Sequence, residues 1–189
     1  MLSEDTICFK TRFTNSLLLN NKLWPNDYEV AVYFIPQTND QKLQNITYEK
    51  YKWVFGRAFQ NSIFIPSDEK IYDSVKTFKN DIIDFVSDPV DQIIGVTIMS
   101  KLNSIGGEFL KVQNIEIDSW QGENLRYNIT ADSPEWDVVQ DLEKEITNPW
   151  WLSDKPIFTN YEKNMLTWEE IGFTINAESK LRLVKGGGK

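Results

Sequence analysis

The sequence predicts a single α+β domain in which a mixed or antiparallel sheet packs against helices, with a tryptophan-rich C-terminal third. Three patterns predict it: a mostly apolar strand at Tyr28–Ile35, a helical period of apolar residues at Ser67–Val86, and a hairpin pattern within 109–130. A chain of 189 residues suits one domain of ordinary size. We expect this domain to span residues 1–185, followed by a flexible tail at 186–189.

The central helix is predicted over Ser67–Val86, because apolar residues recur there every three or four positions. Ser67 follows a proline and suits the N-cap position. The next segment, Val90–Ile105, is apolar nearly all round, which fits either a buried helix or a buried strand. Its start after Asp88-Pro89 and its stop at Gly106-Gly107 favour the helix. The residues on the apolar face of the first helix are Ile71, Val75, Phe78, Ile82 and Phe85.

Several shorter strands complete the predicted sheet. Thr6–Phe13 alternates loosely and should end at the polar Thr14-Asn-Ser16. The strand at Tyr28–Ile35 carries apolar residues on both faces, so we expect a central strand covered on both sides. Ser62–Ile65 is a short buried strand. Alternation on both sides of a glycine-bearing turn predicts a hairpin formed by Phe109–Asp118 and Leu125–Thr130.

Two more helices and a final hairpin are expected. One helix should begin near Thr47, and another should follow Asp132 and end at Asn148-Pro149. Thr167-Trp-Glu-Glu170 is a capping-box pattern, in which Glu170 bonds back to the amide of Thr167. The last hairpin would join Phe173–Ile175 to Leu181–Val184.

The composition excludes several classes of protein. A net charge of −8 argues against a nucleic-acid groove and against binding to anionic membranes. The chain has a single cysteine, Cys8, and no apolar run long enough to span a bilayer or act as a signal peptide. We therefore expect a cytoplasmic protein with neither a nucleic-acid nor a membrane partner.

The chain contains no histidine, which removes the usual general base and the commonest metal ligand. No cofactor site and no metal site are predicted. The series Asp81, Asp84, Asp88 and Asp91 resembles a cation site in composition, but its helical register favours a solvated face. An enzyme is therefore disfavoured by the sequence without being excluded.

The candidate site residues lie in the C-terminal third. Glu135, Asp137, Asp141 and Glu145 belong to an acidic segment that would form either a docking face for a basic partner or the wet side of an amphipathic helix. The adjacent Trp150 and Trp151 follow a proline, and at least one of them is expected to be exposed in a partner contact.

The function predicted from these features is a non-enzymatic protein-interaction or assembly module that binds a protein partner or a second copy of itself. The high asparagine, isoleucine and lysine content suits a phage-type accessory protein. The alternatives are a carboxylate-dependent enzyme, either metal-assisted or a glycoside hydrolase, and a sugar-binding domain that uses the tryptophan cluster. Glu169, Glu170 and Asp154 are the carboxylates that such an enzyme would use.

Overall fold

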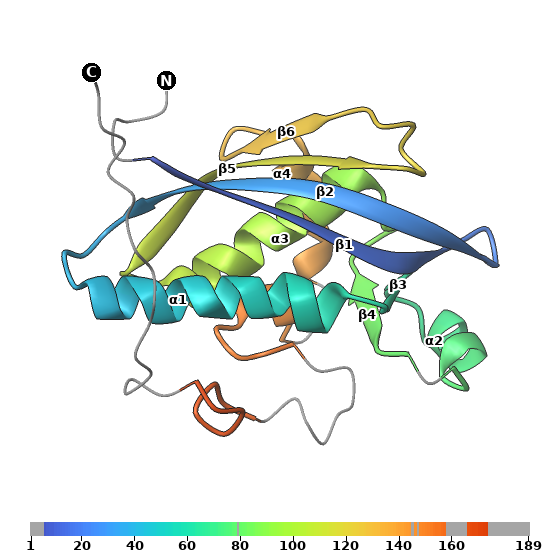
Figure 1. The fold of residues 1–189 in the computed structure, drawn as a ribbon. Helices are drawn as coiled ribbons and strands as arrows, with labels where there is room; N and C mark the ends of the chain where they lie inside the picture. The colour runs from blue at the N-terminus through green and yellow to red at the C-terminus, as the bar shows by residue number, and fades with distance from the viewer. Residues whose placement is uncertain (1–5, 79, 145, 147, 158–165, 174–189) are drawn as a thin grey trace.

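The computed structural model describes residues 6–78, 80–144, 146, 148–157 and 166–173, and within them a six-stranded mixed sheet and four α-helices form one α+β unit (Figure 1). The predicted fold class is confirmed. The strands are β1 (Ile7–Leu19), β2 (Lys22–Pro36), β3 (Ile63–Pro66), β4 (Ile82–Phe85), β5 (Leu110–Ser119) and β6 (Tyr127–Thr130). The helices are α1 (Gln41–Trp53), α2 (Glu69–Val75), α3 (Asp91–Gly106) and α4 (Glu135–Glu143), with a π-helix η1 (Val54–Phe59) and a 3₁₀ turn η2 (Trp150–Leu152).

The strand order is β4-β3-β1-β2-β5-β6. The strands β1, β2, β5 and β6 pair antiparallel, whereas β3 and β4 add to the β1 edge in parallel. The central strand and the β5–β6 hairpin are therefore confirmed. The predicted end of the first strand at Thr14-Asn-Ser16 is wrong, because Asn15 pairs with Asn26 and the β1–β2 ribbon continues to Leu19.

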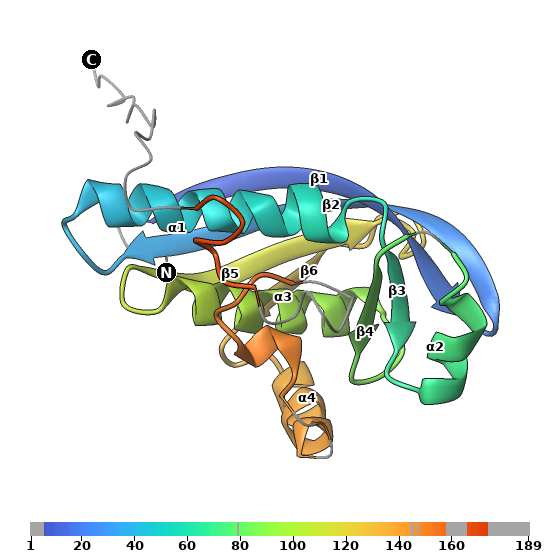
Figure 2. The ribbon, with the colours of Figure 1, turned by 90° about the horizontal axis from the view of Figure 1, so that it is seen from below.

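The main core lies between the sheet and the helices α1 and α3, which run side by side across it (Figure 2). The segment α3 is a helix, as its flanking signals favoured. It lacks a polar side because the sheet, α4 and the η2 segment surround it. Gly107, at φ 51, follows its last turn in the left-handed conformation that glycine adopts readily.

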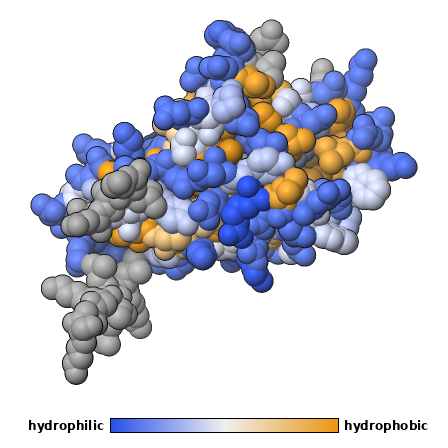
Figure 3. All heavy atoms as spheres, turned by 90° about the horizontal axis from the view of Figure 1, so that it is seen from above, coloured by the Kyte–Doolittle hydropathy of each residue, from blue (hydrophilic) through white to orange (hydrophobic). Residues whose placement is uncertain are grey.

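The opposite face of the sheet is covered by α2 only at the β3–β4 end. Over β1, β2, β5 and β6 this face carries no described helix, and ion pairs join neighbouring strands there, Arg12–Glu29 and Arg126–Asp118 among them. Seen from above, the surface of the molecule is mostly hydrophilic with scattered apolar residues (Figure 3). The prediction that the Tyr28–Ile35 strand is covered on both sides is therefore wrong. The small core under α2 consists of Leu18, Ile63, Ile65, Val75 and Ile82.

The predicted helix Ser67–Val86 is also wrong. The helix α2 ends at Val75, and its N-cap is Asp68, whose carboxylate accepts the amides of Lys70 (2.8 Å) and Ile71 (3.2 Å). Residues 82–85 form β4 instead, because pairing with β3 satisfies their backbone groups inside the core. The helices that cover the core face of the sheet are therefore α1 and α3.

Of the remaining predicted elements, one begins at a different residue, one is confirmed and one lies mostly outside the described residues. The helix expected from Thr47 begins earlier, at Gln41, because Asp40 caps its first turn. The helix after Asp132 is confirmed as α4. Residues 174–189, with most of the last predicted hairpin and the predicted tail, lie outside the described ranges. In the part of the chain that the structure describes, no helix has the length and apolarity needed to cross a bilayer.

Candidate functional site

The tryptophan pair at 150–151 packs inward. Trp151 is fully buried, and Trp150 is partly buried with its indole Nε1 donating to the carbonyl of Asp84 at 2.8 Å. Trp150 also packs edge-on against Phe85 and Trp151. The expectation that one of the pair is substantially exposed is wrong, because the segment after Pro149 folds back onto α3. A binding role for these rings stays a prediction.

A buried lysine holds this segment in place. Lys101, on α3, is 1% exposed, and its Nζ donates to the carbonyls of Trp150 (2.9 Å), Ser153 (2.6 Å) and Lys155 (2.6 Å). Burial lowers the pKa of Lys101 to about 7, and the Asp154 carboxylate opposes this shift. The Ser104 hydroxyl adds a fourth bond, to the carbonyl of Trp151 at 3.0 Å. The 150–155 segment is thus tied to α3 through its backbone.

The predicted acidic residues are partly brought together. Asp137 and Asp141 are exposed on α4, and Glu135 is partly buried in its first turn. Glu145 lies outside the described ranges. Asp141 forms a surface ion pair with Lys144. This arrangement fits the wet side of an amphipathic helix, while docking of a basic partner on it remains a prediction.

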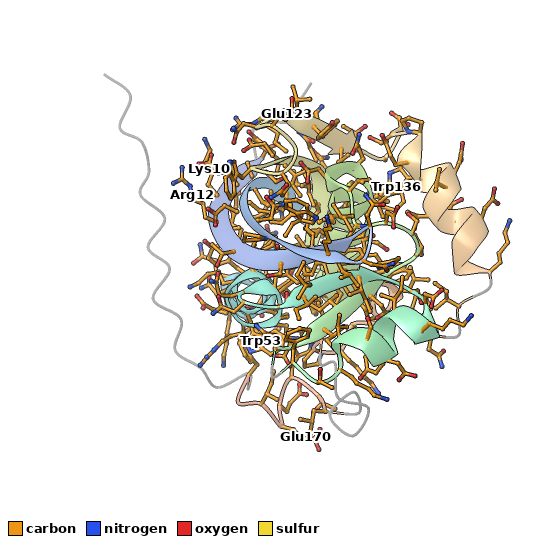
Figure 4. All side chains as sticks on the ribbon, turned by 90° about the vertical axis from the view of Figure 1, so that its right-hand side faces the viewer. Lys10, Arg12, Trp53, Glu123, Trp136 and Glu170 are labelled. Atoms are coloured by element: carbon orange, nitrogen blue, oxygen red, sulfur yellow. The ribbon has the colours of Figure 1, made fainter. Side chains whose placement is uncertain are left out.

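Asp137 also lines an open groove of about 630 Å³ between α3, β5 and α4. We call it the α4 groove. Met99, Val112 and Trp136 are among the residues that line it, and Figure 4 shows Trp136 on α4. Two exposed carboxylates and one exposed ammonium line it as well, those of Asp132, Asp137 and Lys111.

Two hydrogen-bonded side chains fix the walls of the α4 groove. The indole Nε1 of Trp136 donates to the carbonyl of Thr130 at 2.7 Å, which locks the ring against the end of β6. Asn103 accepts the amide of Val112 at 2.8 Å and donates to its carbonyl at 3.4 Å. The Asn103 side chain therefore bonds to β5 as a residue of a further strand would. The α4 groove was not predicted from the sequence, because its lining residues come from α3, β5, α4 and the segment before α4.

A second candidate lies at the other end of the sheet, where α3 begins. The Asp91 carboxylate is 5% exposed and accepts the hydroxyl of Ser119 at 2.9 Å. That hydroxyl accepts the amide of Gly122 at 3.0 Å, and Asn26 accepts the amide of Gln121 at 2.8 Å. A Cβ on Gly122 would lie 2.2 Å from Asp91 Oδ2, so glycine is required for this close approach.

Three further buried side chains surround this carboxylate and leave polar atoms without a partner. Tyr28 pairs with Ser119 across β2 and β5, and Asn26 pairs with Asn15 across β1 and β2. Among the described residues, Tyr28 Oη, Asn26 Nδ2 and both polar atoms of the Asn15 side chain have no hydrogen-bond partner. We call Asn15, Asn26, Tyr28, Asp91 and Ser119 the polar cluster. Unpaired buried polar atoms are costly, so each of these atoms needs a partner such as a buried water molecule or an ion.

The carboxylate controls the electrostatics of the polar cluster. Burial raises the pKa of Asp91, with the Asp118 charge adding to the shift and the Ser119 hydroxyl opposing it. Burial also raises the pKa of Tyr28, and the Asp91 charge adds to that shift. The nearby Asn26 side-chain amide opposes this shift and lowers the pKa of Tyr28, although its distance and angles to Tyr28 Oη do not meet those of a hydrogen bond. The predicted solvated position of Asp91 is therefore wrong.

The titration of Asp91 gives a testable pH dependence. Because the folded protein holds the Asp91 proton more tightly than the unfolded chain does, stability should fall as pH rises from about 3.9 through the raised folded pKa. Asp91→Asn removes this dependence but keeps an oxygen for Ser119. We expect wild type to gain stability relative to this variant between pH 7 and pH 4.5 in urea unfolding. If the difference in stability between wild type and Asp91→Asn were the same at both pH values, the raised pKa of Asp91 would be contradicted. The same holds if exposed Asp88→Asn changed the pH dependence equally.

The three carboxylates proposed for an enzyme site, those of Asp154, Glu169 and Glu170, have different surroundings. Glu170 accepts the amide of Thr167 at 2.7 Å, which confirms the back-bond of the capping box within a turn. Glu169 and Asp154 are exposed. Trp168 is buried and donates to the backbone carbonyl of Asp154. Among the described residues, no three acidic or thiol side chains converge as ligands of a metal ion.

Comparisons with known proteins give no family assignment. No family model matches the chain, and no curated protein matches it in sequence. Two solved structures of 6-pyruvoyltetrahydropterin synthase resemble part of the fold. The Plasmodium vivax enzyme, in a catalytic-residue mutant, has a TM-score of 0.43 and 10% identity, and covers 66% of this chain and 95% of that one. The Plasmodium falciparum enzyme has a TM-score of 0.42 and 15% identity with the same coverage.

These comparisons correct the predicted function. The solved structures that resemble the chain are those of an enzyme, so the prediction of a non-enzymatic interaction or assembly module is contradicted and is not carried further. Neither the structure nor the comparisons support the prediction that the chain is a protein-binding module or a phage-type accessory protein. At this identity and TM-score the likeness assigns no substrate and no particular activity to this chain.

Proposed function

We propose that this chain binds a small polar organic molecule in the α4 groove. The observation that carries the proposal is a concavity of about 630 Å³ in which a hydrogen-bonded tryptophan ring lies beside apolar floor residues and several polar side chains. Sites for small molecules have volumes of about 300–1,000 Å³ and the same mixture of an apolar surface and a few polar groups.

The groups in the groove define what such a molecule would need. The partly exposed ring of Trp136 provides contact for a flat apolar face, whereas Met99 and Val112 are nearly buried beneath it. The amides of Gln113 and Gln140 can both donate and accept hydrogen bonds at its edge. The Asn103 amide is committed to Val112 and so shapes the wall rather than reads the ligand.

Charge narrows the choice of ligand further. Two carboxylates, Asp132 and Asp137, face one ammonium, Lys111, and the whole chain has a net charge of −8. A neutral or positively charged molecule therefore gains from the field of the groove, whereas an anion is repelled. A cation placed over the Trp136 ring gains cation–π attraction as well.

Removal of the Trp136 ring is the direct test. A panel of aromatic amines, nucleosides and monosaccharides is screened by saturation-transfer NMR, and any hit is titrated by calorimetry. We expect Trp136→Ala to weaken the best hit by about tenfold or more, which is about 1.4 kcal/mol. Gln140→Ala, on the exposed side of α4, should weaken it without loss of fold.

The matched control is Trp120→Ala, which removes an indole that is 61% exposed and lies outside the groove. This variant should bind as wild type does. The proposal fails if no member of the panel binds wild type, or if the hits bind Trp136→Ala and Gln140→Ala with unchanged affinity.

A further inference from the structure

The polar cluster is almost completely buried and contains a carboxylate and several polar atoms without a hydrogen-bond partner. Asp91 and Tyr28 are 5% and 1% exposed, and Asn15 is 6% exposed. The carboxylate of Asp91 has one hydroxyl donor, from Ser119, and no positively charged side chain forms an ion pair with it among the described residues. Its place in the first turn of α3 gives it a favourable helix dipole, and a further positive partner would compensate the buried charge more fully.

The strand pairing places these residues next to one another on the sheet. The cross-strand pairs Asn15–Asn26 and Tyr28–Ser119 lie on neighbouring strands, and the charge of Asp91 acts directly on Tyr28. Asn15 Oδ1 and Tyr28 Oη both lack a partner, so both are free to act as ligands. The unpaired Asn26 Nδ2 is a donor, and it suits a water molecule in the shell of an ion.

We propose that the polar cluster binds a hard monovalent cation, Na⁺ or K⁺, through Asp91, Tyr28 and Asn15. Oxygen ligands are those that hard cations prefer. The single carboxylate matches a single positive charge, and no third acidic or thiol side chain is present among the described residues to favour a divalent ion. The ion neutralises the buried charge and occupies the unpaired oxygens at once, so the pH dependence expected above for Asp91 applies to the ion-free protein, in tetramethylammonium salt.

The occupant most easily confused with a cation is a group of buried water molecules, which satisfies polar atoms equally well. Water differs in one measurable respect, because its binding does not depend on which salt is dissolved. A cation that binds only the folded protein raises the melting temperature in proportion to the logarithm of its concentration above Kd.

The test compares melting temperatures of the full chain in NaCl, KCl and tetramethylammonium chloride at equal ionic strength. We expect Na⁺ or K⁺ to raise Tm by about 2–4 °C relative to the bulky tetramethylammonium ion. A shift of this size corresponds to an increase of about fivefold in the folding equilibrium constant. Line broadening of the ²³Na NMR signal by the protein, relieved by K⁺, reports the ion directly.

Two variants locate the site. Asp91→Asn should abolish the difference between the salts. Tyr28→Phe removes one oxygen but keeps the ring that stacks on Phe13 at 4.7 Å, so it should fold and show a reduced difference. The exposed Asp88→Asn serves as the matched control and should respond as wild type does.

Equal melting temperatures of wild type in the three salts would overturn the proposal and assign the cluster to water. A salt-specific difference that persists unchanged in Tyr28→Phe, or in a folded Asp91→Asn, would overturn it too, because the ion would then bind elsewhere.

Discussion

Replacing Lys101 by methionine is expected to lower the free energy of unfolding by about 3–5 kcal/mol. The substitution keeps a side chain of similar length but removes the donor to the carbonyls of Trp150, Ser153 and Lys155. These bonds are part-buried, and each carbonyl that loses its partner away from water costs about 1–3 kcal/mol. Urea unfolding followed by circular dichroism measures the change.

The matched control is Lys52→Met, which removes an exposed lysine that pairs with Glu49 on the surface of α1. Exposed ion pairs contribute about 0–1 kcal/mol, so this variant should unfold close to wild type. If Lys101→Met also lost less than about 1 kcal/mol, the carbonyls would have other partners and the 150–155 segment would not depend on this lysine.

Replacing Trp151 by alanine is expected to cost about 3–5 kcal/mol, because the ring is fully buried and its removal leaves a cavity. The neighbouring Leu152 is 53% exposed, and Leu152→Ala should stay within about 0.5 kcal/mol of wild type. Thermal unfolding of the two variants decides between core and surface. Little loss in Trp151→Ala would return the ring to the exposed role expected from sequence.

Elements whose local pattern and tertiary setting agree could be predicted from the sequence. The strand β2, the β5–β6 hairpin and α3 each carry a clear apolar pattern and a turn or glycine at the end. The segment 67–86 shows the opposite case. Ile82 and Phe85 fit a helical period with Ile71 and Val75, but pairing with β3 decides their conformation. A period over four positions cannot weigh a parallel partner strand that lies elsewhere in the chain.

The candidate sites were missed because their residues gain meaning only through distant contacts. Asn15 and Asn26 have the composition of turns, and they are buried because the β1–β2 ribbon extends past them. Lys101 carries an ordinary charge in the sequence, and its three carbonyl partners lie about fifty residues away. For Trp150 and Trp151, Pro149 gave correct information about the local backbone but none about the surface that the segment meets.

The bonds between Asn103 and Val112 have a consequence for how copies of this chain meet. Beyond the part of β5 that pairs with β6, the strand would offer a free amide and carbonyl to any extended segment nearby. Asn103 occupies both groups of Val112 from within the same molecule. A strand of another molecule therefore cannot form backbone hydrogen bonds with Val112. This protects the edge against the stepwise strand addition that leads to fibril growth.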